Sequence, residues 1–576
     1  MTHKTCTHSI AVTGSGGTGA ITAGNILLQT VAKSGLFGLL RRSVGPQIRG
    51  GESAALLRLS SDVVGCPDDR FDVLLAFDWN NNQRFSSEIP LDENSLVIFD
   101  PASGDLPDNI RSKNVKVLEV PLKALAKEVS GGRINMVGLG VVADLMGLSE
   151  KNAKLVITES LTKKGQDAVT AAVASFDSGF NCQKNIMLPC KMPQASNTNI
   201  CWNISGNEAV GLGALHAGIK FVAAYPITPA TDIVEWIAPR IEKVGGSIVQ
   251  AEDELAAINM IIGASFGGVP SLTTTSGPGL SLMSEGIGLA VASEIPTVIV
   301  NVMRGGPSTG IPTKSEQSDL NIALYGLHGD APHIVVAPLD IIDCIYTTSW
   351  VVELAETLQT PAIVLSDQYL GQSRQISTAI DLLKVTLQRA EPDLALDSYS
   401  RYQFSDDGVS AMAAPGIPGC SYTADGLEHE ESGKPSSIDQ DHIQQLEKRQ
   451  KKLTQYDFGE QWAKINGSGN VAIVTWGSCA EAVLEAQQRL SHQGFNIKVI
   501  AMRLLLPAQV QAFNDSLNGV DKLLTVELSH SLQFYHYLKS HYQLPAKVHQ
   551  LSRPGPLALT PSEVVIAVEK LVEKQA

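Results

Sequence analysis

The stretch Tyr225-Pro226-Ile227-Thr228-Pro229-Ala230-Thr231 lies where an apolar run gives way to a turn, which Pro226 and Pro229 keep out of helix. Three similar stretches follow, each after another apolar run: Glu252-Asp253-Glu254, Thr275-Ser276-Gly277-Pro278-Gly279 and Arg304-Gly305-Gly306-Pro307-Ser308-Thr309-Gly310. This order is typical of successive strand–loop–helix units. The sequence therefore predicts an α/β fold in which all these loops open on one edge of a parallel sheet, the edge where such sheets bind ligands.

Length and composition describe a multidomain globular protein. The chain has 576 residues, of which 44% are hydrophobic and 18% charged, and its net charge is −15. This charge argues against nucleic acid or an anionic membrane as the main partner. No apolar run approaches the ~18 residues of a membrane span, and the N-terminus is unlike a signal peptide. We therefore expect a cytoplasmic protein.

The cysteines are scattered along the chain, and none belongs to a C-x-x-C pair. A [4Fe–4S] cluster needs four thiolates, which are usually clustered in sequence. Structural disulfides are rare in cytoplasmic proteins. We therefore expect isolated buried thiols, no disulfide and no iron–sulfur cluster on this chain. The cysteines are Cys6, Cys66, Cys182, Cys190, Cys201, Cys344, Cys420 and Cys479.

A glycine-rich loop, Gly14-Ser15-Gly16-Gly17-Thr18-Gly19, lies between a predicted strand and a predicted helix over residues 20–32. It fits G-x-G-x-x-G, but enzymes of that type that use NAD need an acidic residue about 20 positions later, and none precedes Glu52. Basic residues near the loop suit phosphates at a helix N-terminus instead. A structural turn, a site for coenzyme A or another phosphate ligand, and a site for NAD(P) all remain open. The basic residues are Lys4, Lys33, Arg41, Arg42 and Arg49.

The order and the sequences of the four turns resemble those of the pyrimidine-binding domain of the 2-oxoacid:ferredoxin oxidoreductases, which are thiamine diphosphate enzymes. The segment from Gly45 to Glu52, and Asn135-Met136 near Gly138 and Gly140, resemble the gamma domain of the same family. The resemblance implies a Rossmann-like gamma domain (1–181), a pyrimidine-binding thiamine diphosphate domain (204–375), an extended linker (376–461) and a transketolase C-terminal-like domain (462–576).

The resemblance also assigns roles to residues of this chain. Glu254 aligns with the carboxylate that binds N1′ of the aminopyrimidine, and Thr228 and Arg304 align with the residues that hold the substrate carboxylate. Plainer interpretations exist, because Glu254 also fits a helix cap and Arg304 a structural ion pair. Tyr225, Pro226 and Ile227 are implied to flank thiamine diphosphate, and Gly14, Gly16, Gly17 and Gly19 to contact coenzyme A. Substrate contacts are implied for Arg49, Ser308, Thr309 and Lys314, although Arg49 also fits a surface pair with Glu52, and Lys314 plain loop charge.

One expected motif is missing. The family binds the diphosphate and Mg²⁺ through a G-D-G motif, and Gly329-Asp330-Ala331 lacks its second glycine. No metal ligand is therefore assigned to this chain. The resemblance implies that a beta subunit supplies the diphosphate site, Mg²⁺ and the [4Fe–4S] cluster, that ferredoxin accepts the electrons, and that the assembly is (αβ)2.

The implied activity is reversible oxidative decarboxylation of 2-oxoglutarate with coenzyme A to succinyl-CoA, CO2 and reduced ferredoxin. Pyruvate, branched-chain 2-oxoacids and indolepyruvate remain open as substrates, and so does the direction, the reverse of which fixes CO2 in a reductive tricarboxylic acid cycle. Two other classes of function also remain: an NAD(P) dehydrogenase that uses the glycine-rich loop, and a non-catalytic scaffold subunit.

Overall fold

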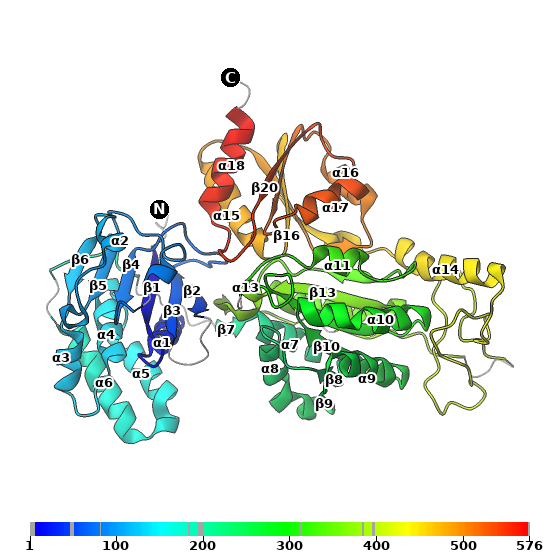
Figure 1. The fold of residues 1–576 in the computed structure, drawn as a ribbon, viewed down its shortest axis with the longest axis horizontal. Helices are drawn as coiled ribbons and strands as arrows, with labels where there is room; N and C mark the ends of the chain where they lie inside the picture. Colours follow the sequence, from blue (N-terminus) through cyan, green and yellow to red (C-terminus); the bar gives the residue numbers. More distant parts are fainter. Residues whose placement is uncertain are drawn as a thin grey trace. The chain divides into compact units, whose positions relative to one another are not determined.

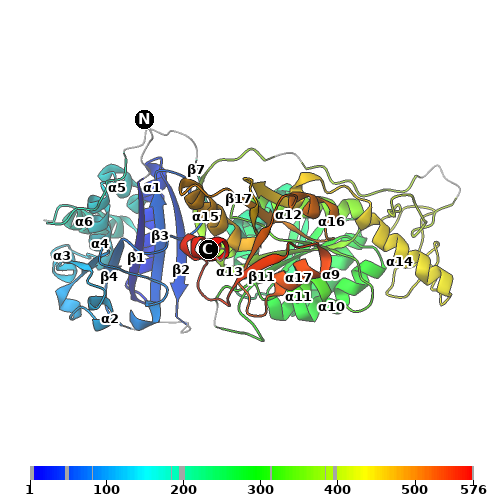
Figure 2. The same cartoon turned by 90° about the horizontal axis from the view of Figure 1, so that it is seen from above.

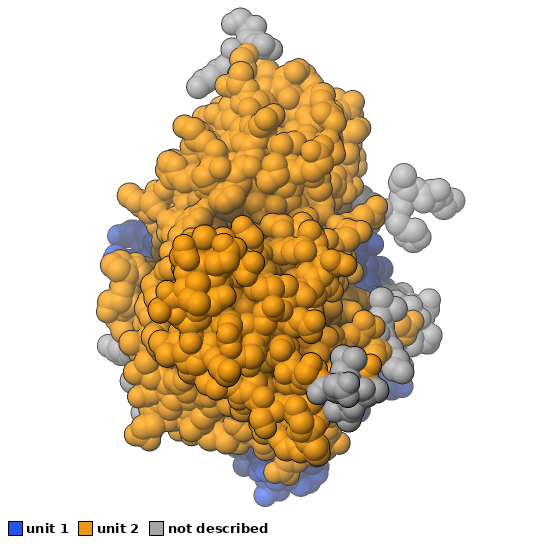
Figure 3. All heavy atoms as spheres, turned by 90° about the vertical axis from the view of Figure 1, so that its right-hand side faces the viewer, with its two compact units in different colours: residues 1–205, 373–380, 559–561 blue, residues 206–372, 381–558, 562–576 orange. Residues whose placement is uncertain are grey.

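The computed structural model describes residues 6–45, 51–80, 82–182, 185–193, 201–311, 314–382, 385–393 and 398–573. The chain divides into two compact units, which Figure 3 shows in different colours. Unit 1 comprises residues 1–205, 373–380 and 559–561, and unit 2 comprises residues 206–372, 381–558 and 562–576. In the described part of the chain, no helix is long and apolar enough to cross a membrane.

Unit 1 is built on an eight-stranded sheet with the order β6-β5-β4-β1-β3-β2-β14-β7. Strands β1, β4, β5 and β6 are parallel, whereas β3, β2, β14 and β7 pair antiparallel. The strands are β1 (Thr7–Ser15), β2 (Phe37–Val44), β3 (Glu52–Ser60), β4 (Val73–Ala76), β5 (Leu96–Phe99), β6 (Lys116–Glu119), β7 (Cys201–Ser205) and β14 (Arg374–Thr378).

Both faces of this sheet are covered. Along β1, Ile10 and Val12 join the larger apolar core, whereas Ala11 between them joins a smaller core on the other face. The larger core holds residues of α1, α4, α5 and α6, the helical layer of Figures 1 and 2. The helices are α1 (Ala20–Lys33), α2 (Asp108–Arg111), α3 (Leu122–Lys127), α4 (Ile134–Met146), α5 (Glu150–Leu161) and α6 (Gln166–Phe180).

Two strands of this sheet come from beyond the N-terminal segment. β7 and β14 are far apart in sequence, yet they pair over Cys201–Ser205 and Arg374–Thr378, and β14 also pairs with β2. The Gln375 side chain adds a 2.8 Å hydrogen bond to the Val64 carbonyl oxygen. The chain therefore returns to its first sheet after completing most of its second, which no local sequence pattern indicates.

The expectation that the chain has no disulfide is wrong, because Cys6 and Cys190 are bonded in unit 1. The two cysteines are 184 residues apart, and the segment after α6 brings Cys190 beside the residue that precedes β1. Scanning for closely spaced cysteine pairs cannot detect such a contact. The other six cysteines are free thiols, and three of them, Cys66, Cys344 and Cys479, are buried as expected.

Unit 2 contains a seven-stranded sheet with the order β18-β12-β13-β11-β10-β8-β9 and a five-stranded sheet with the order β15-β17-β16-β19-β20. In the first, every strand except β18 is parallel to its neighbours. The strands are β8 (Phe221–Ala224), β9 (Ser247–Gln250), β10 (Ser271–Thr275), β11 (Thr297–Met303), β12 (Ile334–Val336), β13 (Pro361–Asp367), β15 (Ala463–Asn466), β16 (Val471–Trp476), β17 (Ile497–Met502), β18 (Leu504–Leu506), β19 (Lys522–Glu527) and β20 (Lys547–Ser552).

The helices of unit 2 mostly connect parallel strands, as expected for crossover connections. The two sheets are linked by β18, which pairs with β12, and by Gln317, whose side chain donates to the Trp476 carbonyl oxygen over 3.0 Å. The helices are α7 (Gly206–His216), α8 (Thr231–Ile241), α9 (Glu254–Phe266), α10 (Gly277–Ala292), α11 (Leu320–Tyr325), α12 (Asp343–Leu358), α13 (Gln368–Gln372), α14 (Asp439–Thr454), α15 (Ala480–His492), α16 (Val510–Ser516), α17 (Gln533–His541) and, from Ser562 onward, α18 (Pro561–Glu573).

The long connector is fixed to the seven-stranded part of unit 2 by a buried ionic cluster. Lys448 and Lys452 on α14 both bind the carboxylate of Glu294, at 2.6 and 2.7 Å, just beyond the end of α10. Arg401 donates to the Glu294 carbonyl oxygen over 2.8 Å. His429 stacks on Tyr402 with ring centroids 3.6 Å apart. His429 therefore has a packing role.

Candidate active site

The loops that the sequence singled out do meet at one sheet edge. Strands β11, β10, β8 and β9 are adjacent and parallel, so their carboxyl ends lie together (Figure 1). The chain moves outward from β8 to β9 and then crosses back to β10 on the other side of β8. That reversal is a topological switch point, where open α/β sheets have their ligand crevice.

Glu254 is the first residue of α9, and it is only 6% exposed. The helix cap is its neighbour Asp253, whose carboxylate accepts a 2.7 Å hydrogen bond from the Ala256 amide. Capping therefore does not explain Glu254. Its buried carboxylate lies at the N-terminus of α9, where it can accept a hydrogen bond from a proton-bearing ligand nitrogen.

Two glycines of the turn after β10 allow close approach to two carboxylates. A methyl group on Gly279 would lie 2.0 Å from Thr275 Oγ1 and 2.7 Å from Glu254 Oε1. A methyl group on Gly277 would lie 2.8 Å from the Asp319 carboxylate. The Ser276 hydroxyl between them is buried and has no hydrogen-bond partner within the described chain. The glycines thus keep the space around Glu254 open.

Arg304 follows β11 and joins two of the predicted loops. Its Nη1 donates a 2.7 Å hydrogen bond to the carbonyl oxygen of Thr228, and its Nε is buried without a partner in the described chain. Thr228 itself is exposed. A guanidinium with unused donors beside an exposed threonine is suited to bind a carboxylate.

The Arg304 loop closes on itself. The Gly305 amide donates to the Lys314 carbonyl oxygen over 2.8 Å, and the Gly310 amide donates to the Pro307 carbonyl oxygen over 3.0 Å. Ser308 and Thr309 are therefore exposed at the tip, and Ser308 has a left-handed φ of 56°. This geometry brings Lys314 back to the base of the loop beside Arg304.

The turn after β8 is held in place by hydrogen bonds to its carbonyl oxygens. The Ile227 carbonyl oxygen accepts hydrogen bonds from the Ala230 and Thr231 amides at 2.8 and 3.1 Å, which begin α8. The buried Asn207 side chain donates to the Pro229 carbonyl oxygen over 2.9 Å. Tyr225 and Pro226 are exposed, Tyr225 by 40%. The turn therefore presents its apolar side chains to whatever covers the crevice.

Asp319 is a site residue that sequence reasoning missed. It accepts a 2.9 Å hydrogen bond from Asn301 Nδ2 on β11 and lies near Arg304, although burial raises the pKa of its carboxyl group. Ser318 beside it donates to the Arg304 carbonyl oxygen over 3.1 Å. Burial, followed by the charge of Asp319, also raises the pKa of Glu316. The acid-rich run 315–319 after the glycine loop was the available signal.

The glycine-rich loop of unit 1 borders a cavity of about 990 Å³. Gly17 and Gly19 have left-handed φ values of 94° and 87°, and a methyl group on Gly19 would lie 2.3 Å from Asn135 Nδ2. Gly16 donates to the Gly51 carbonyl oxygen over 2.6 Å, and a methyl group on Gly14 would lie 2.5 Å from Thr18 Oγ1. The cavity is lined by Gly17, Thr18, Gly19, Arg133, Asn135 and Lys164, among others.

The strand arrangement around this loop differs from that of a dinucleotide fold. β1 lies between parallel β4 and antiparallel β3. The first acid after the loop, Glu52, is buried and pairs with Arg84 at 2.8 Å. That carboxylate is therefore engaged by an arginine rather than free for a ribose hydroxyl. Arg49 lies outside the described residues.

Comparisons with known proteins identify the family. Residues 212–448 match the thiamine diP-binding model of pyruvate flavodoxin/ferredoxin oxidoreductase, residues 9–182 match the pyruvate ferredoxin/flavodoxin oxidoreductase model, and residues 460–552 match the transketolase C-terminal domain. The 2-oxoacid:ferredoxin oxidoreductase subunit alpha of a Sulfolobus species is 31% identical over 90% of this chain and 90% of its own. The chain belongs to the family of 2-oxoacid:ferredoxin oxidoreductase alpha subunits.

Other relatives of this 2-oxoacid:ferredoxin oxidoreductase subunit point in the same direction. The 2-oxoglutarate synthase subunit KorA of Archaeoglobus fulgidus is 36% identical over 57% of this chain and 87% of its own. A 2-oxoglutarate:ferredoxin oxidoreductase structure from Magnetococcus marinus, with 2-oxoglutarate, coenzyme A and succinyl-CoA bound, superimposes with a TM-score of 0.92 at 35% identity, covering 98% of this chain and 100% of that one. The predicted oxidoreductase class and multidomain α/β fold are confirmed.

Proposed function

We propose that this alpha subunit takes part in the thiamine diphosphate-dependent oxidative decarboxylation of 2-oxoglutarate with coenzyme A. The observation that carries the proposal is the convergence of Glu254, Arg304 and Thr228 at one switch point of a parallel sheet. We propose the gamma, pyrimidine-binding, linker and transketolase-like division at residues 181, 204, 375 and 461 as the working domain map.

The residues present fit the aminopyrimidine half of thiamine diphosphate. Glu254 offers a buried carboxylate, and Gly279 leaves open the space that a side chain would fill beside it. The Ser276 hydroxyl, buried and unpartnered in the described chain, offers one more polar contact. In our proposal Glu254 holds the proton at the pyrimidine N1′. When bound, thiamine diphosphate supplies the carbon nucleophile that attacks the keto group.

The substrate carboxylate is assigned to Arg304 and Thr228. Arg304 Nη1 is occupied by the Thr228 carbonyl oxygen, which holds the guanidinium against the β8 turn while Nε remains available. Lys314, at the base of the same loop, is our candidate for the second carboxylate of 2-oxoglutarate, with Ser308 and Thr309 at its rim. Tyr225, Pro226 and Ile227 are proposed to flank the cofactor.

Coenzyme A is assigned to unit 1. The cavity beside Gly17 and Gly19 lies at the N-terminus of α1 and includes Arg133 and Lys164, a combination suited to phosphates. Its volume of about 990 Å³ is in the range for a large ligand. Gly14 and Gly16 shape the turn in front of it. Arg49 is proposed as a contact of the 2-oxoacid substrate.

A partner subunit is proposed to complete the site. Large apolar side chains are exposed on the turn after β8, at the start of α9 and on α10: Tyr225 is 40%, Leu255 49% and Leu282 49% exposed. Asp330, in the sequence Gly329-Asp330-Ala331 that lacks the second glycine, is exposed in the turn after α11. We therefore assign the diphosphate, Mg²⁺ and the [4Fe–4S] cluster to a beta subunit in an (αβ)2 assembly that reduces ferredoxin.

The proposal is tested by coenzyme A-dependent viologen reduction under anoxic conditions, with the chain co-expressed with its beta subunit. Three substrates are compared at equal concentration: 2-oxoglutarate, pyruvate and 2-oxoisovalerate. We expect kcat/KM to be at least tenfold higher for 2-oxoglutarate, because a second carboxylate contact is a charge-assisted hydrogen bond. A preference for pyruvate would overturn the substrate assignment. Activity with none of the three, from a complex that retains cluster and cofactor, would overturn the proposed function.

A further inference from the structure

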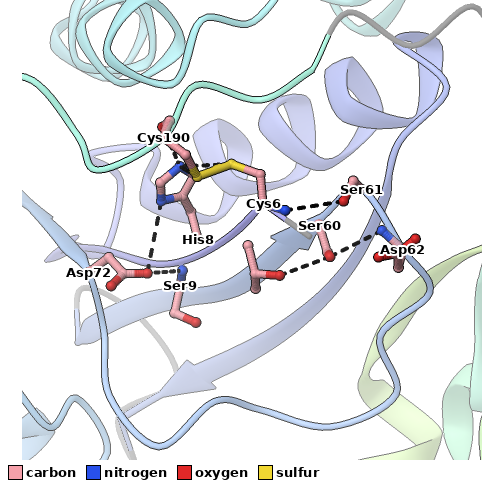
Figure 4. The surroundings of a disulfide bond; sticks show 9 residues. Cys6, His8, Ser9, Ser60, Ser61, Asp62, Asp72 and Cys190 are labelled. Atoms are coloured by element: carbon pink, nitrogen blue, oxygen red, sulfur yellow. Dashed lines mark hydrogen bonds and ion pairs between the residues drawn. A yellow bond between two sulfur atoms is a disulfide. The ribbon is translucent and has the colours of Figure 1, made fainter. Parts of the chain in front are cut away.

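We propose that Cys6, Cys190 and His8 in unit 1 form a reversible thiol–disulfide redox site. This inference is independent of the proposed decarboxylation, because it concerns a group of side chains to which that reaction assigns no role. Figure 4 shows the disulfide with the imidazole ring of His8 directly beside it.

His8 contacts both sulfur atoms through the same nitrogen. Its Nε2 lies 3.7 Å from Cys6 Sγ and 3.5 Å from Cys190 Sγ. The same nitrogen is 2.9 Å from the Cys190 carbonyl oxygen, so Nε2 carries a proton and donates it to that oxygen. The ring is only 2% exposed. A purely structural disulfide needs no buried proton donor against its sulfurs.

Asp72 supports the ring from its opposite side. Its Oδ2 lies 4.0 Å from His8 Nδ1 and also accepts a 2.9 Å hydrogen bond from the Ser9 amide, which fixes the carboxylate (Figure 4). Cys6, Cys190, His8 and Asp72 therefore form the chain sulfur–imidazole–carboxylate, in which the Nε2–H group of His8 faces the sulfur that becomes a thiolate and can donate a hydrogen bond to it.

The exposures of the two cysteines give the reaction a direction. Cys6 is 7% exposed, whereas Cys190 is only partly buried in a segment without helix or strand. A thiolate of an external dithiol attacks Cys190 Sγ, the sulfur–sulfur bond breaks, and its electron pair leaves on Cys6 Sγ beside His8. The second thiol of the reductant then displaces Cys190 and closes its own disulfide. Two electrons and two protons pass from the dithiol to the cysteine pair, and an external disulfide reverses the exchange.

Reduction removes the covalent link between the start of β1 and the segment after α6. That segment then depends on hydrogen bonds, including 2.9 Å from His8 to the Cys190 carbonyl oxygen and 2.8 Å from the Met192 amide to the Met146 carbonyl oxygen. Lys191 between these two contacts is exposed. Reduction is therefore expected to increase tryptic cleavage after Lys191, and re-oxidation is expected to decrease it again.

The first test counts thiols on the full-length folded chain. The protein is equilibrated with dithiothreitol in mixtures of its reduced and oxidised forms, acid-quenched, denatured and labelled with polyethylene glycol–maleimide. We expect six labelled thiols in the oxidised protein and eight in the reduced protein, from the six free cysteines plus the bonded pair. Re-oxidation should restore six. The double variant C6S/C190S should give six throughout and should lose the difference in Lys191 cleavage.

The second test measures the rate at which dithiothreitol opens the bond. His8→Gln keeps an amide donor for the Cys190 carbonyl oxygen but removes the imidazole ring from the two sulfur atoms, so we expect opening about tenfold slower at an unchanged final thiol count. His328→Gln, an exposed histidine of unit 2, is the matched control and should have no effect. If His8→Gln does not fold by circular dichroism, Asp72→Asn, which leaves the ring in place, is expected to slow opening in the same direction.

Three results would overturn the inference. The pair could resist dithiothreitol until the protein unfolds, which would make it a structural link. Opening rates could be equal in wild type, His8→Gln and Asp72→Asn, which would remove the role of the ring. The reduced wild type, but not C6S, could retain one zinc ion per chain by elemental analysis. In that case these residues, whose ligand atoms all lie within 4.8 Å, would be a metal site instead.

Discussion

At Gly279, one added methyl group changes the geometry of the site without changing any charge. In Gly279→Ala that methyl would lie 2.0 Å from Thr275 Oγ1 and 2.7 Å from Glu254 Oε1, so the carboxylate must move. We expect kcat to fall at least tenfold while the complex stays assembled, since misplacement of a reacting group by about 1 Å costs up to 10²-fold. Gly263→Ala is the control: it lies on α9 with open space around its Cβ, and should retain full activity.

Arg304→Lys keeps the charge beside the β8 turn but removes the planar donor fork. We expect KM for the 2-oxoacid to rise about tenfold or more with a smaller change in kcat, because the lost interaction is made in the ground state as well as in the transition state. Steady-state viologen reduction measures both constants. Arg240→Lys on exposed α8 is the control. An unchanged KM would show that Arg304 contacts no carboxylate.

Residues that belong to a short sequence motif were predictable from the sequence. Residues whose importance depends on tertiary contacts were not. Arg304 and Thr228 stand in recognisable turns, and the structure places them 2.7 Å apart. Asp319 was missed because its significance depends on Asn301 and on the absence of a side chain at Gly277. His8 and Asp72 were missed for the same reason, since they become neighbours only when β1 and β4 pair.

At the scale of elements, α14 and the end of α10 are held together by one buried acid and three cations. Neighbouring Lys448, Lys452 and Arg401 lower the pKa of Glu294 even though its burial alone would raise it, so its carboxylate is ionised. Burial, opposed by Glu294 and reinforced by the other cations, lowers the pKa of Lys452 to about 7. Glu294 is therefore the group on which this contact depends.

Glu294→Gln leaves buried cations without their acid, so we expect the free energy of unfolding to fall by about 3 kcal/mol or more and the apparent Tm to fall by about 4 °C or more at pH 7. The folded-state pKa of Glu294 lies below its ordinary value of 4.5. Its stabilising contribution is thus complete above that pH and declines as pH falls below it, by about 1.4 kcal/mol per pH unit. Thermal unfolding followed from pH 7 to pH 3.5 should show the two proteins converging.

Glu285→Gln, on the exposed face of the same helix α10, is the matched control and should shift Tm by less than about 1 °C. Equal effects of the two substitutions, or a gap between wild type and Glu294→Gln that does not narrow with acid, would show that the cluster does not fasten the connector.

Element positions followed the sequence closely where periodicity and turns were strong. The predicted helix over residues 20–32 coincides with α1. Periodicity could not predict which strands pair with one another. In sequence β14 follows directly on the elements of unit 2, yet it hydrogen-bonds to β2 and β7 of unit 1. Register between distant strands depends on burial that a single strand does not encode.

For the whole molecule, the account predicts that the cofactor site is shared between two chains. Titration calorimetry with magnesium thiamine diphosphate should show no saturable binding to this chain alone up to about 1 mM, because the chain offers contacts only for the aminopyrimidine half. The complex with its beta subunit should bind one cofactor per pair of chains. Tight binding by the isolated chain would place the diphosphate site on this chain. It would contradict the proposal that the cofactor site is shared with the beta subunit.

The most direct test of the central claim compares Glu254→Gln with wild type in the assembled complex, at equal cofactor and cluster content. Glu254 is proposed to hold the proton at N1′, and glutamine keeps the size of the side chain but not its basicity. We predict that 2-oxoglutarate-dependent viologen reduction falls by about 10² to 10⁴, whereas Glu252→Gln, at an exposed position two residues earlier, stays near wild type. Wild-type activity in Glu254→Gln would contradict the account and favour a scaffold role for this subunit.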